Sequence, residues 1–142
     1  MGDARATLPV AVVGAVVAEG RMIWTFTVLG RPVGKQRPRV TGRGTFTPSE
    51  TLDYERQVFS AALAAGVRAG SGPVAVNVRI WPPSRRGDVD NWLKSVLDGL
   101  ARAPVLDGDD WTRVRRASAE VVAVDARQPR VDVTVTMLEV ER

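Results

Sequence analysis

The residues best suited to chemistry in this sequence are two short acidic clusters. The stretch DVDN at residues 88–91 places Asp88 and Asp90 one residue apart, and the stretch DGDD at residues 107–110 ends in a pair of aspartates. Mg²⁺ and Mn²⁺ bind to a few carboxylates together with water and the phosphate oxygens of a substrate. If the segment between the clusters brings its two ends together, three carboxylates converge and repel one another unless a cation lies between them. The joint pattern therefore indicates a shared metal site.

Each cluster also has a purely structural explanation when it is taken alone. An Asp at a helix start caps free N–H groups and complements the helix dipole, and Asp90 and Lys94 are spaced for an i,i+4 ion pair. Asp and Gly are turn formers, so DGDD is equally typical of a solvated acidic turn. Lys94 is one of only two lysines in the chain. Its choice over arginine favours a site that needs a compact charge with three donors, but an exposed helical lysine is also ordinary.

The composition excludes several kinds of catalytic site. The sequence has no Cys and no His, so thiolate nucleophiles, Ser-His-Asp triads, histidine general bases and ordinary zinc sites are all ruled out. Catalysis must then depend on carboxylates, Lys, Arg, Tyr or hydroxyls. Disulfides are impossible too, which fits the cytoplasm. A length of 142 residues with 44% hydrophobic and 25% charged residues predicts one folded domain.

The distribution of charge points to a polyanionic partner. The net charge is +4 and the pI is near 10.6. No acid occurs between Glu19 and Glu50, where the basic residues are Arg21, Arg31, Lys35, Arg37, Arg39 and Arg43. By contrast, six of the sixteen acids fall between Asp88 and Asp110. A basic segment suits nucleic acid, and an acidic cluster inside a basic protein suits a cation held near that polyanion.

The basic segment does not form a nucleotide-binding loop of the Walker type. GRPVGKQ has three residues between its glycines instead of four, and Gln36 follows the lysine where Ser or Thr is needed. The sequence KQRPR is better interpreted as an extended finger in which Lys35, Arg37 and Arg39 track phosphates. A solvated basic loop is the alternative.

Hydrophobic periodicity predicts the elements that position these residues. It predicts strands at residues 22–30, 74–82, 111–124 and 131–138, and helices at about 50–69 and from 89 to just before 104. The order is β-loop-α-β-α-β-β, which predicts a single-domain α+β fold in which two helices pack on a small mixed sheet. Residues 1–21 are an N-terminal extension of doubtful order or, alternatively, an added strand, and their apolar run is too short to span a bilayer. We expect no membrane contact.

From Met22 to the C-terminus the chain resembles RusA-type Holliday-junction resolvases, small endonucleases common in prophages. The resemblance rests on the strand that leads into GRPVGKQRPR, on DVDNWLKSVLDGL and on LDGDDWTRV. It implies a domain over residues 22–142. The D-x-D-N-x-x-K spacing, with D-x-L seven residues after the Asn and an Asp pair downstream, is specific only as a set.

The resemblance also implies roles for individual residues. Asp88, Asp90 and Asp110 are the implied ligands of Mg²⁺ or Mn²⁺, Lys94 is the implied catalytic cation, and Asn91 supports the site. The spacer before the Asp pair is one residue longer than the family pattern, and Trp111 replaces a smaller or polar residue, so Asp109 is the alternative to Asp110. The residues expected to contact DNA are Lys35, Arg37, Arg39, Arg43, Arg85 and Arg86.

The implied function is metal-dependent cleavage of Holliday junctions and related branched DNA in recombination and repair. A four-way junction has approximate two-fold symmetry and needs two opposed cuts, so a homodimer is expected, without any small-molecule cofactor. A rival interpretation is a non-catalytic basic module that binds nucleic acid. A third, a ribosome-like RNA-binding protein, leaves the acidic clusters unexplained.

Overall fold

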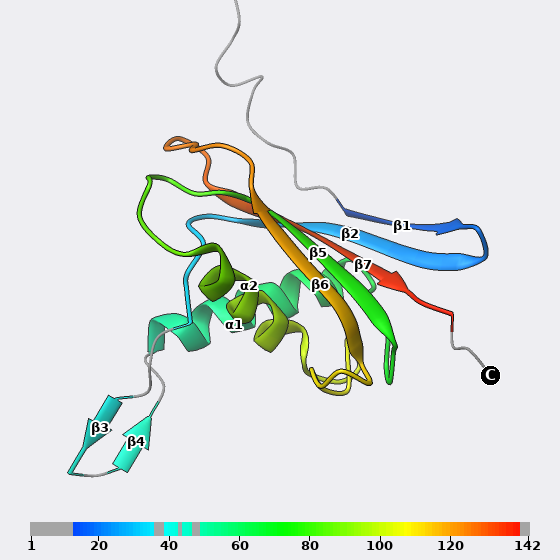
Figure 1. The fold of residues 1–142 in the computed structure, drawn as a ribbon, viewed down its shortest axis with the longest axis horizontal. Coiled ribbons are helices and arrows are strands. Elements are labelled where there is room, and N and C mark those ends of the chain that lie inside the picture. Colours follow the sequence, from blue (N-terminus) through cyan, green and yellow to red (C-terminus); the bar gives the residue numbers. More distant parts are fainter. Residues whose placement is uncertain (1–12, 36–38, 43, 47–48, 140–142) are drawn as a thin grey trace, which may run out of the picture.

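The computed structural model describes residues 13–35, 39–42, 44–46 and 49–139, and these form an α+β fold (Figure 1). A five-stranded sheet has the order β1-β2-β7-β5-β6, and a separate two-stranded sheet pairs β3 with β4. The strands are β1 (Val13–Ala18), β2 (Arg21–Leu29), β3 (Arg39–Thr41), β4 (Gly44–Phe46), β5 (Val74–Trp81), β6 (Val114–Val121) and β7 (Arg130–Met137), and the helices are α1 (Ser49–Ala64) and α2 (Val89–Leu100). The predicted fold class and element order are confirmed.

The connection from β5 to β6 determines where the acidic clusters lie. These two strands are parallel, whereas β5 and β2 both pair antiparallel with β7. Parallel neighbours need a crossover, and α2 supplies it. The chain leaves the end of β5, enters α2, runs back along the sheet and reaches the start of β6 (Figure 1). The two ends of α2 therefore lie at opposite ends of the β5–β6 pair.

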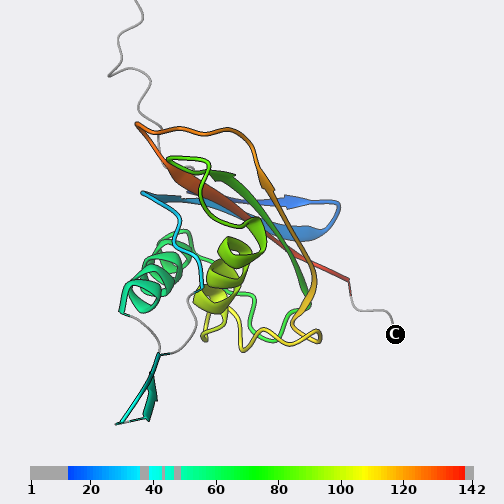
Figure 2. The ribbon, with the colours of Figure 1, turned by 60° about the vertical axis from the view of Figure 1, so that its left-hand side comes forward.

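Both helices pack on the same face of the sheet, as the turned view makes clear (Figure 2). Alternate residues of β5 and β7 point to that face because side chains alternate along a strand. The helices approach closely at Gly99, where an added Cβ would lie 2.8 Å from the Val58 Cβ and 2.9 Å from the Glu55 carbonyl oxygen. Buried residues of this core include Val74, Val76, Val78, Ile80, Val131, Val133 and Val135 from the sheet, and Tyr54, Val58, Ala62, Trp92, Val96 and Leu100 from the helices.

Helix α1 is shorter than predicted and ends at Ala64 instead of residue 69. The N–H of Val67 donates to the Ala62 carbonyl, and the N–H of Gly66 donates to the Leu63 carbonyl. With Gly66 at a φ of +79°, these bonds form a Schellman motif, which terminates a helix. The residue that ends the helix is thus Gly66, and the GSGP stretch lies beyond it.

Other boundaries also differ from the predicted ones. Helix α2 ends at Leu100. β6 covers only Val114–Val121, since residues 111–113 form a turn before it and the strand ends three residues earlier than predicted. The predicted loop at residues 31–49 contains the β3–β4 hairpin, which projects away from the sheet and helices in both views (Figures 1 and 2).

Upstream of residue 22 the structure contains the added strand that was the alternative for this segment. β1 pairs antiparallel with β2, from Val13 opposite Phe26 to Ala18 opposite Arg21. Residues 1–12 lie outside the described residues. No helix in the described ranges is long and apolar enough to cross a membrane.

Candidate functional site

The first acidic cluster forms the start of α2. The carbonyl of Asp88 accepts the N–H of Trp92 at 3.1 Å, which opens the helix, but the Asp88 side chain makes no capping hydrogen bond. Asp88 and Asp90 are both exposed, and their carboxylates form no hydrogen bond or ion pair with any residue in the described part of the chain. The capping explanation of Asp88 is therefore wrong for its side chain. Two unpaired carboxylates of this kind are donors that Mg²⁺ and Mn²⁺ accept.

The backbone before Asp88 is held by a tight contact with Trp92. Gly87 has a φ of +114°, and an added Cβ would lie 2.2 Å from Cζ2 of the Trp92 indole. Only glycine tolerates this combination of dihedral angle and close approach. Trp92 itself is buried in the core. The packed indole thus determines where the exposed carboxylate of Asp88 emerges.

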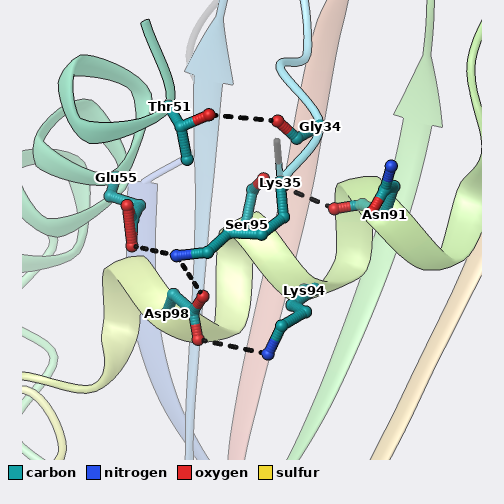
Figure 3. Close-up of polar contacts among 8 residues, drawn as sticks. All are labelled: Gly34, Lys35, Thr51, Glu55, Asn91, Lys94, Ser95 and Asp98. Atoms are coloured by element: carbon teal, nitrogen blue, oxygen red, sulfur yellow. Dashed lines mark hydrogen bonds and ion pairs between the residues drawn. The ribbon is translucent and has the colours of Figure 1, made fainter. Parts of the chain in front are cut away.

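A separate group of charges lies between α1 and the later turns of α2, where Lys35 meets the carboxylates of Glu55 and Asp98 (Figure 3). The ammonium of Lys35 is 2.9 Å from Asp98 Oδ2 and 3.4 Å from Glu55 Oε1. Burial acts to lower the pKa of Lys35, but the hydrogen bond to Asp98 and the charges of Asp98 and Glu55 outweigh it and raise this pKa above 10.5. Glu55 is buried in α1, so Lys35 compensates a carboxylate that would otherwise be costly to bury.

The segment that carries Lys35 is hydrogen-bonded directly to α2. The N–H of Lys35 donates to the Asn91 carbonyl at 3.3 Å, and Gly34 packs against the Asn91 side chain (Figure 3). On the α1 side, the Thr51 hydroxyl donates to the Gly34 carbonyl at 3.4 Å. These hydrogen bonds attach the segment before the β3–β4 hairpin to α2, the helix that follows Asp88.

Lys94 forms a different ion pair from the one that its spacing suggested. Its ammonium lies 4.0 Å from Asp98 Oδ1, one turn further along α2 (Figure 3). Asp90 and Lys94, both of which the structure describes, form no ion pair with each other. The Lys94 side chain is 60% exposed, so the ammonium remains accessible from solvent. Asp98 thus contacts both lysines of the chain.

The second acidic cluster forms a compact turn at the start of β6. The Asp110 carboxylate accepts hydrogen bonds from the Thr112 hydroxyl and, at 2.9 Å, from the Thr112 N–H. The Asp110 carbonyl accepts the N–H groups of Arg113 and Val114 at 2.9 Å each. The bonds from Thr112, followed by the charge of Arg113, lower the pKa of Asp110 below 3.8. Asp110 is therefore an ionised carboxylate with an established structural role in a turn.

Within one chain the structure does not bring Asp110 to Asp88 and Asp90. Helix α2 has 12 residues, which at 1.5 Å per residue is about 18 Å of helix. Asp88 precedes the N-terminus of α2. The carbonyl of Arg113, which belongs to the Asp110 turn, accepts a hydrogen bond from the N–H of Val74, the first residue of β5. Asp110 therefore lies near the start of β5, whereas Asp88 follows its end. In agreement, no group of three His, Cys, Asp or Glu in the ranges described here is gathered closely enough to hold a metal ion. Asp109 lies on the same side as Asp110, beside it in the sequence.

The predicted DNA contacts fall into three groups. Arg85 and Arg86 are exposed on the loop before Asp88. Lys35 is only 25% exposed and is ion-paired internally. Arg37, Arg43 and the side chain of Arg39 lie outside the described residues.

A cavity of about 360 Å³ separates the loop that carries Lys35 from the loop that carries Asp88. Polar residues on its wall include Arg31, Lys35, Arg86, Asp88 and Asn91. It is open to solvent beside the first acidic cluster and has cationic groups on both walls.

Sequence reasoning missed the roles of Glu55 and Asp98. For Asp98 a signal was available, since it stands four residues after Lys94 on the same helix. For Glu55 there was none, because a Glu in an exposed-looking helical segment gives no indication that it is buried against a lysine 20 residues earlier.

Comparison with protein families links the sequence of this chain to a known family. A family model described as endodeoxyribonuclease RusA matches residues 30–136, which is most of the chain and includes both acidic clusters. The comparison with curated proteins found no match.

Proposed function

Because the chain belongs to the RusA endodeoxyribonuclease family, we propose that it is a metal-dependent endonuclease that resolves Holliday junctions and related branched DNA. The observation that carries the proposal is the pair of exposed, unpaired carboxylates of Asp88 and Asp90 at the start of α2, with the exposed ammonium of Lys94 on the same helix. This activity would belong to DNA recombination and repair in the cytoplasm.

Asp88 and Asp90 are the proposed ligands of Mg²⁺ or Mn²⁺, with Asp110 as the third. All three offer hard oxygen donors, and their exposure leaves room for the waters that Mg²⁺ retains. The bound ion would acidify an attacking water and offset the charge of the scissile phosphate. Asp109 remains the alternative third ligand because it neighbours Asp110 and is also exposed.

Lys94 is the proposed catalytic cation. A positive charge near the phosphate contributes most when negative charge grows on the phosphate oxygens in the transition state. Asp98 contacts Lys94 from the next turn and so limits the positions that its ammonium adopts. Asn91 supports the site through its backbone, which holds the Lys35 segment against the first turn of α2.

The basic residues around Asp88 are the proposed contacts with the DNA backbone. Arg85 and Arg86 precede Asp88 directly and are exposed, and Arg86 lines the cavity that adjoins it. Arg37, Arg39 and Arg43 belong to the hairpin segment and Lys35 stands at its entry, so the proposal extends to them. Phosphate contacts of this kind position the duplex and make binding depend on salt.

A homodimer is the proposed working unit. The separation of Asp110 from Asp88 within one chain supports it, since a site that needs all three carboxylates is completed more readily by the Asp110 of a second copy than by refolding the β5–α2–β6 unit. Two-fold pairing would produce two such sites, which matches the two cuts that a four-way junction requires.

Cleavage assays with three labelled substrates test the proposal directly. The protein is incubated with a four-way junction, a flap and a linear duplex in Mg²⁺, Mn²⁺ or EDTA. We expect cleavage of the branched substrates with either metal and none in EDTA. Salt-dependent binding without cleavage under any of these conditions would favour the non-catalytic binding module instead.

A further inference from the structure

Trp111 is the most exposed large hydrophobic side chain in the described part of the protein, at 73%. The other tryptophans have partners: Trp24 and Trp92 are buried, and Trp81 lies against the guanidinium groups of Arg79 and Arg130 at 5.3 and 4.2 Å from its ring centre. An indole exposed to this extent is unusual, because tryptophan is highly buried on average. Its exposure therefore indicates contact with something outside the chain.

The exposure of Trp111 does not come from a loosely held segment. On its N-terminal side the chain is anchored by the buried residues Val105 and Leu106 and by the N–H of Asp107, which donates to the Gly70 carbonyl at 2.8 Å. On its C-terminal side the Arg113 carbonyl accepts the N–H of Val74 at 2.7 Å. Between these anchors, the hydrogen bonds of the Asp110 turn hold the backbone on both sides of the indole. The backbone at Trp111 is therefore already ordered before a partner binds, so binding to the ring costs little additional conformational entropy.

The surroundings of Trp111 distinguish a nucleic-acid contact from a protein interface. No other residue from 101 to 120 has an exposed large hydrophobic side chain. The acids Asp107, Asp109 and Asp110 precede Trp111 instead, and the exposed Arg115 and Arg116 follow it on the edge strand β6. A protein interface needs a contiguous apolar core, which this segment does not offer. A single exposed aromatic ring followed in the sequence by exposed arginines is suited to stack on a nucleobase while the cations contact the phosphates.

We propose that Trp111 is a stacking platform for a nucleobase that is unpaired or exposed at a DNA branch point. This inference rests on the proposed function, since it takes branched DNA as the substrate and Asp110 as part of the site. A continuous duplex presents no base face to such a ring, whereas the open centre of a junction does. Trp111 therefore favours branched over linear DNA without reading sequence, because every base has a face that can stack.

Binding measurements with Trp111→Ala and Trp111→Phe test the proposal. In EDTA, which prevents metal-dependent cleavage, we expect Trp111→Ala to weaken junction binding by roughly 5- to 150-fold, the range for loss of one base stack. Linear duplex binding should change by less than about twofold, and Trp111→Phe should retain most of the junction affinity because a smaller ring still stacks. Val124→Ala is the control, since Val124 is an exposed apolar residue, 50% exposed, outside this segment.

A second readout is the fluorescence of the protein. Stacking on a base quenches an indole, so the difference spectrum between wild type and Trp111→Phe should lose intensity when junction is added and remain unchanged with duplex. Equal loss of affinity for junction and duplex in Trp111→Ala would overturn the proposal. So would unchanged junction affinity, or a change of sedimentation from dimer to monomer in Trp111→Ala, which would assign the indole to contact with a second copy of the chain.

Failure of this inference can be told apart from failure of the proposed function. A wild-type protein that neither cleaves branched DNA nor prefers it over duplex overturns both. A wild-type protein that does cleave and prefer branched DNA, with Trp111→Ala behaving like Val124→Ala, overturns the stacking role alone.

Discussion

The ammonium of Lys35 lies 2.9 Å from Oδ2 of Asp98, the same carboxylate whose other oxygen is 4.0 Å from the ammonium of Lys94. Asp98 on α2 thereby forms ion pairs with both lysines of the protein. It links Lys35, which precedes the β3–β4 hairpin, to Lys94, the proposed catalytic cation. Lys35 also neutralises the buried Glu55. Its ion pairs explain why a lysine in a basic segment has a pKa above its ordinary value despite partial burial.

Replacing Lys35 by methionine should destabilise the fold. The change leaves Glu55 and Asp98 close together without a counter-charge, and we expect a loss on the order of 2 kcal/mol in the free energy of unfolding, measured by urea denaturation. Arg86→Ala is the matched control, because Arg86 is exposed and forms no ion pair with the residues described. Its stability should stay within about 0.5 kcal/mol of wild type. A fully stable Lys35→Met would contradict a structural role for the lysine.

The same two variants separate structural from DNA-contacting cations. Arg86→Ala should lower the slope of log affinity against log salt by about one unit, as expected for one lost phosphate contact. If Lys35 also contacts phosphate as proposed, Lys35→Met lowers the slope similarly, in addition to its stability loss. An unchanged slope for Lys35→Met would restrict that residue to its internal ion pairs.

Asp90→Asn should abolish cleavage while the fold and junction binding persist. The amide keeps the shape of the carboxylate but removes the charge that binds the metal, and repulsion from Asp88 also decreases. Cleavage and gel-shift assays on the same preparation measure the two effects. Asp53→Asn is a suitable control, since Asp53 is an exposed helical aspartate in α1. Undiminished cleavage by Asp90→Asn would remove this residue from the proposed site.

Lys94→Ala should lower the cleavage rate by roughly 100-fold and junction affinity by much less. The reason is that its charge matters most in the transition state, so kcat falls further than binding does. Single-turnover rates with saturating protein, compared with dissociation constants in EDTA, give the two quantities. Equal losses in both would make Lys94 a DNA-binding residue.

Mixing Asp90→Asn with Asp110→Asn should restore activity if two copies of the chain share each site. After random exchange of subunits about half of the dimers are mixed, and each mixed dimer has one site with a complete set of carboxylates. The asparagine at position 110 still accepts the N–H of Thr112, so the turn should survive. On a cruciform plasmid the mixture should produce relaxed circles, whereas wild type produces linear product directly. A mixture as inactive as its components would contradict the shared site.

Tyr54→Phe should reduce the sensitivity of the fold to alkaline pH. Burial raises the pKa of Tyr54 above its ordinary value of 10.0, and its hydroxyl has no hydrogen-bond partner among the residues described. A group whose pKa is raised on folding contributes stability below its unfolded pKa, and this contribution is lost as pH rises above about 10. Phenylalanine does not ionise, so this loss at high pH disappears. It also removes a buried hydroxyl that has no hydrogen-bond partner among the residues described, and that removal should stabilise the fold by about 1 kcal/mol at pH 8.

Urea denaturation at pH 8 and pH 11 compares the two proteins. The chain has one tyrosine, so phenolate absorbance reports Tyr54 alone. Lys35 loses its stabilising charge in the same alkaline direction. The free energy of unfolding of Tyr54→Phe should therefore still depend on pH to some extent. The double variant with Tyr54→Phe and Lys35→Met should show a smaller pH dependence.

The sequence alone determined the elements of the fold and the residue types available for chemistry. Alternation in Val131, Val133 and Val135 requires a strand with one buried face, and the spacing of Val96 and Leu100 requires a helix, because these patterns depend only on the periods of the two structures. The absence of Cys and His limited the chemistry to carboxylates, Lys, Arg, Tyr and hydroxyls. Element ends were less predictable, since the end of α1 depends on the backbone angles of Gly66.

Only the tertiary structure decided which charged groups meet. Lys35, Glu55 and Asp98 come from a loop and two helices, and their encounter depends on α1 packing against α2 at Gly99. Asp88 and Asp110 lie at opposite ends of α2 because β5 and β6 are parallel, and a crossover between parallel strands must traverse the length of the sheet. Hydrophobic period is a local property of the chain, whereas the direction in which two strands pair is settled only when the whole core packs.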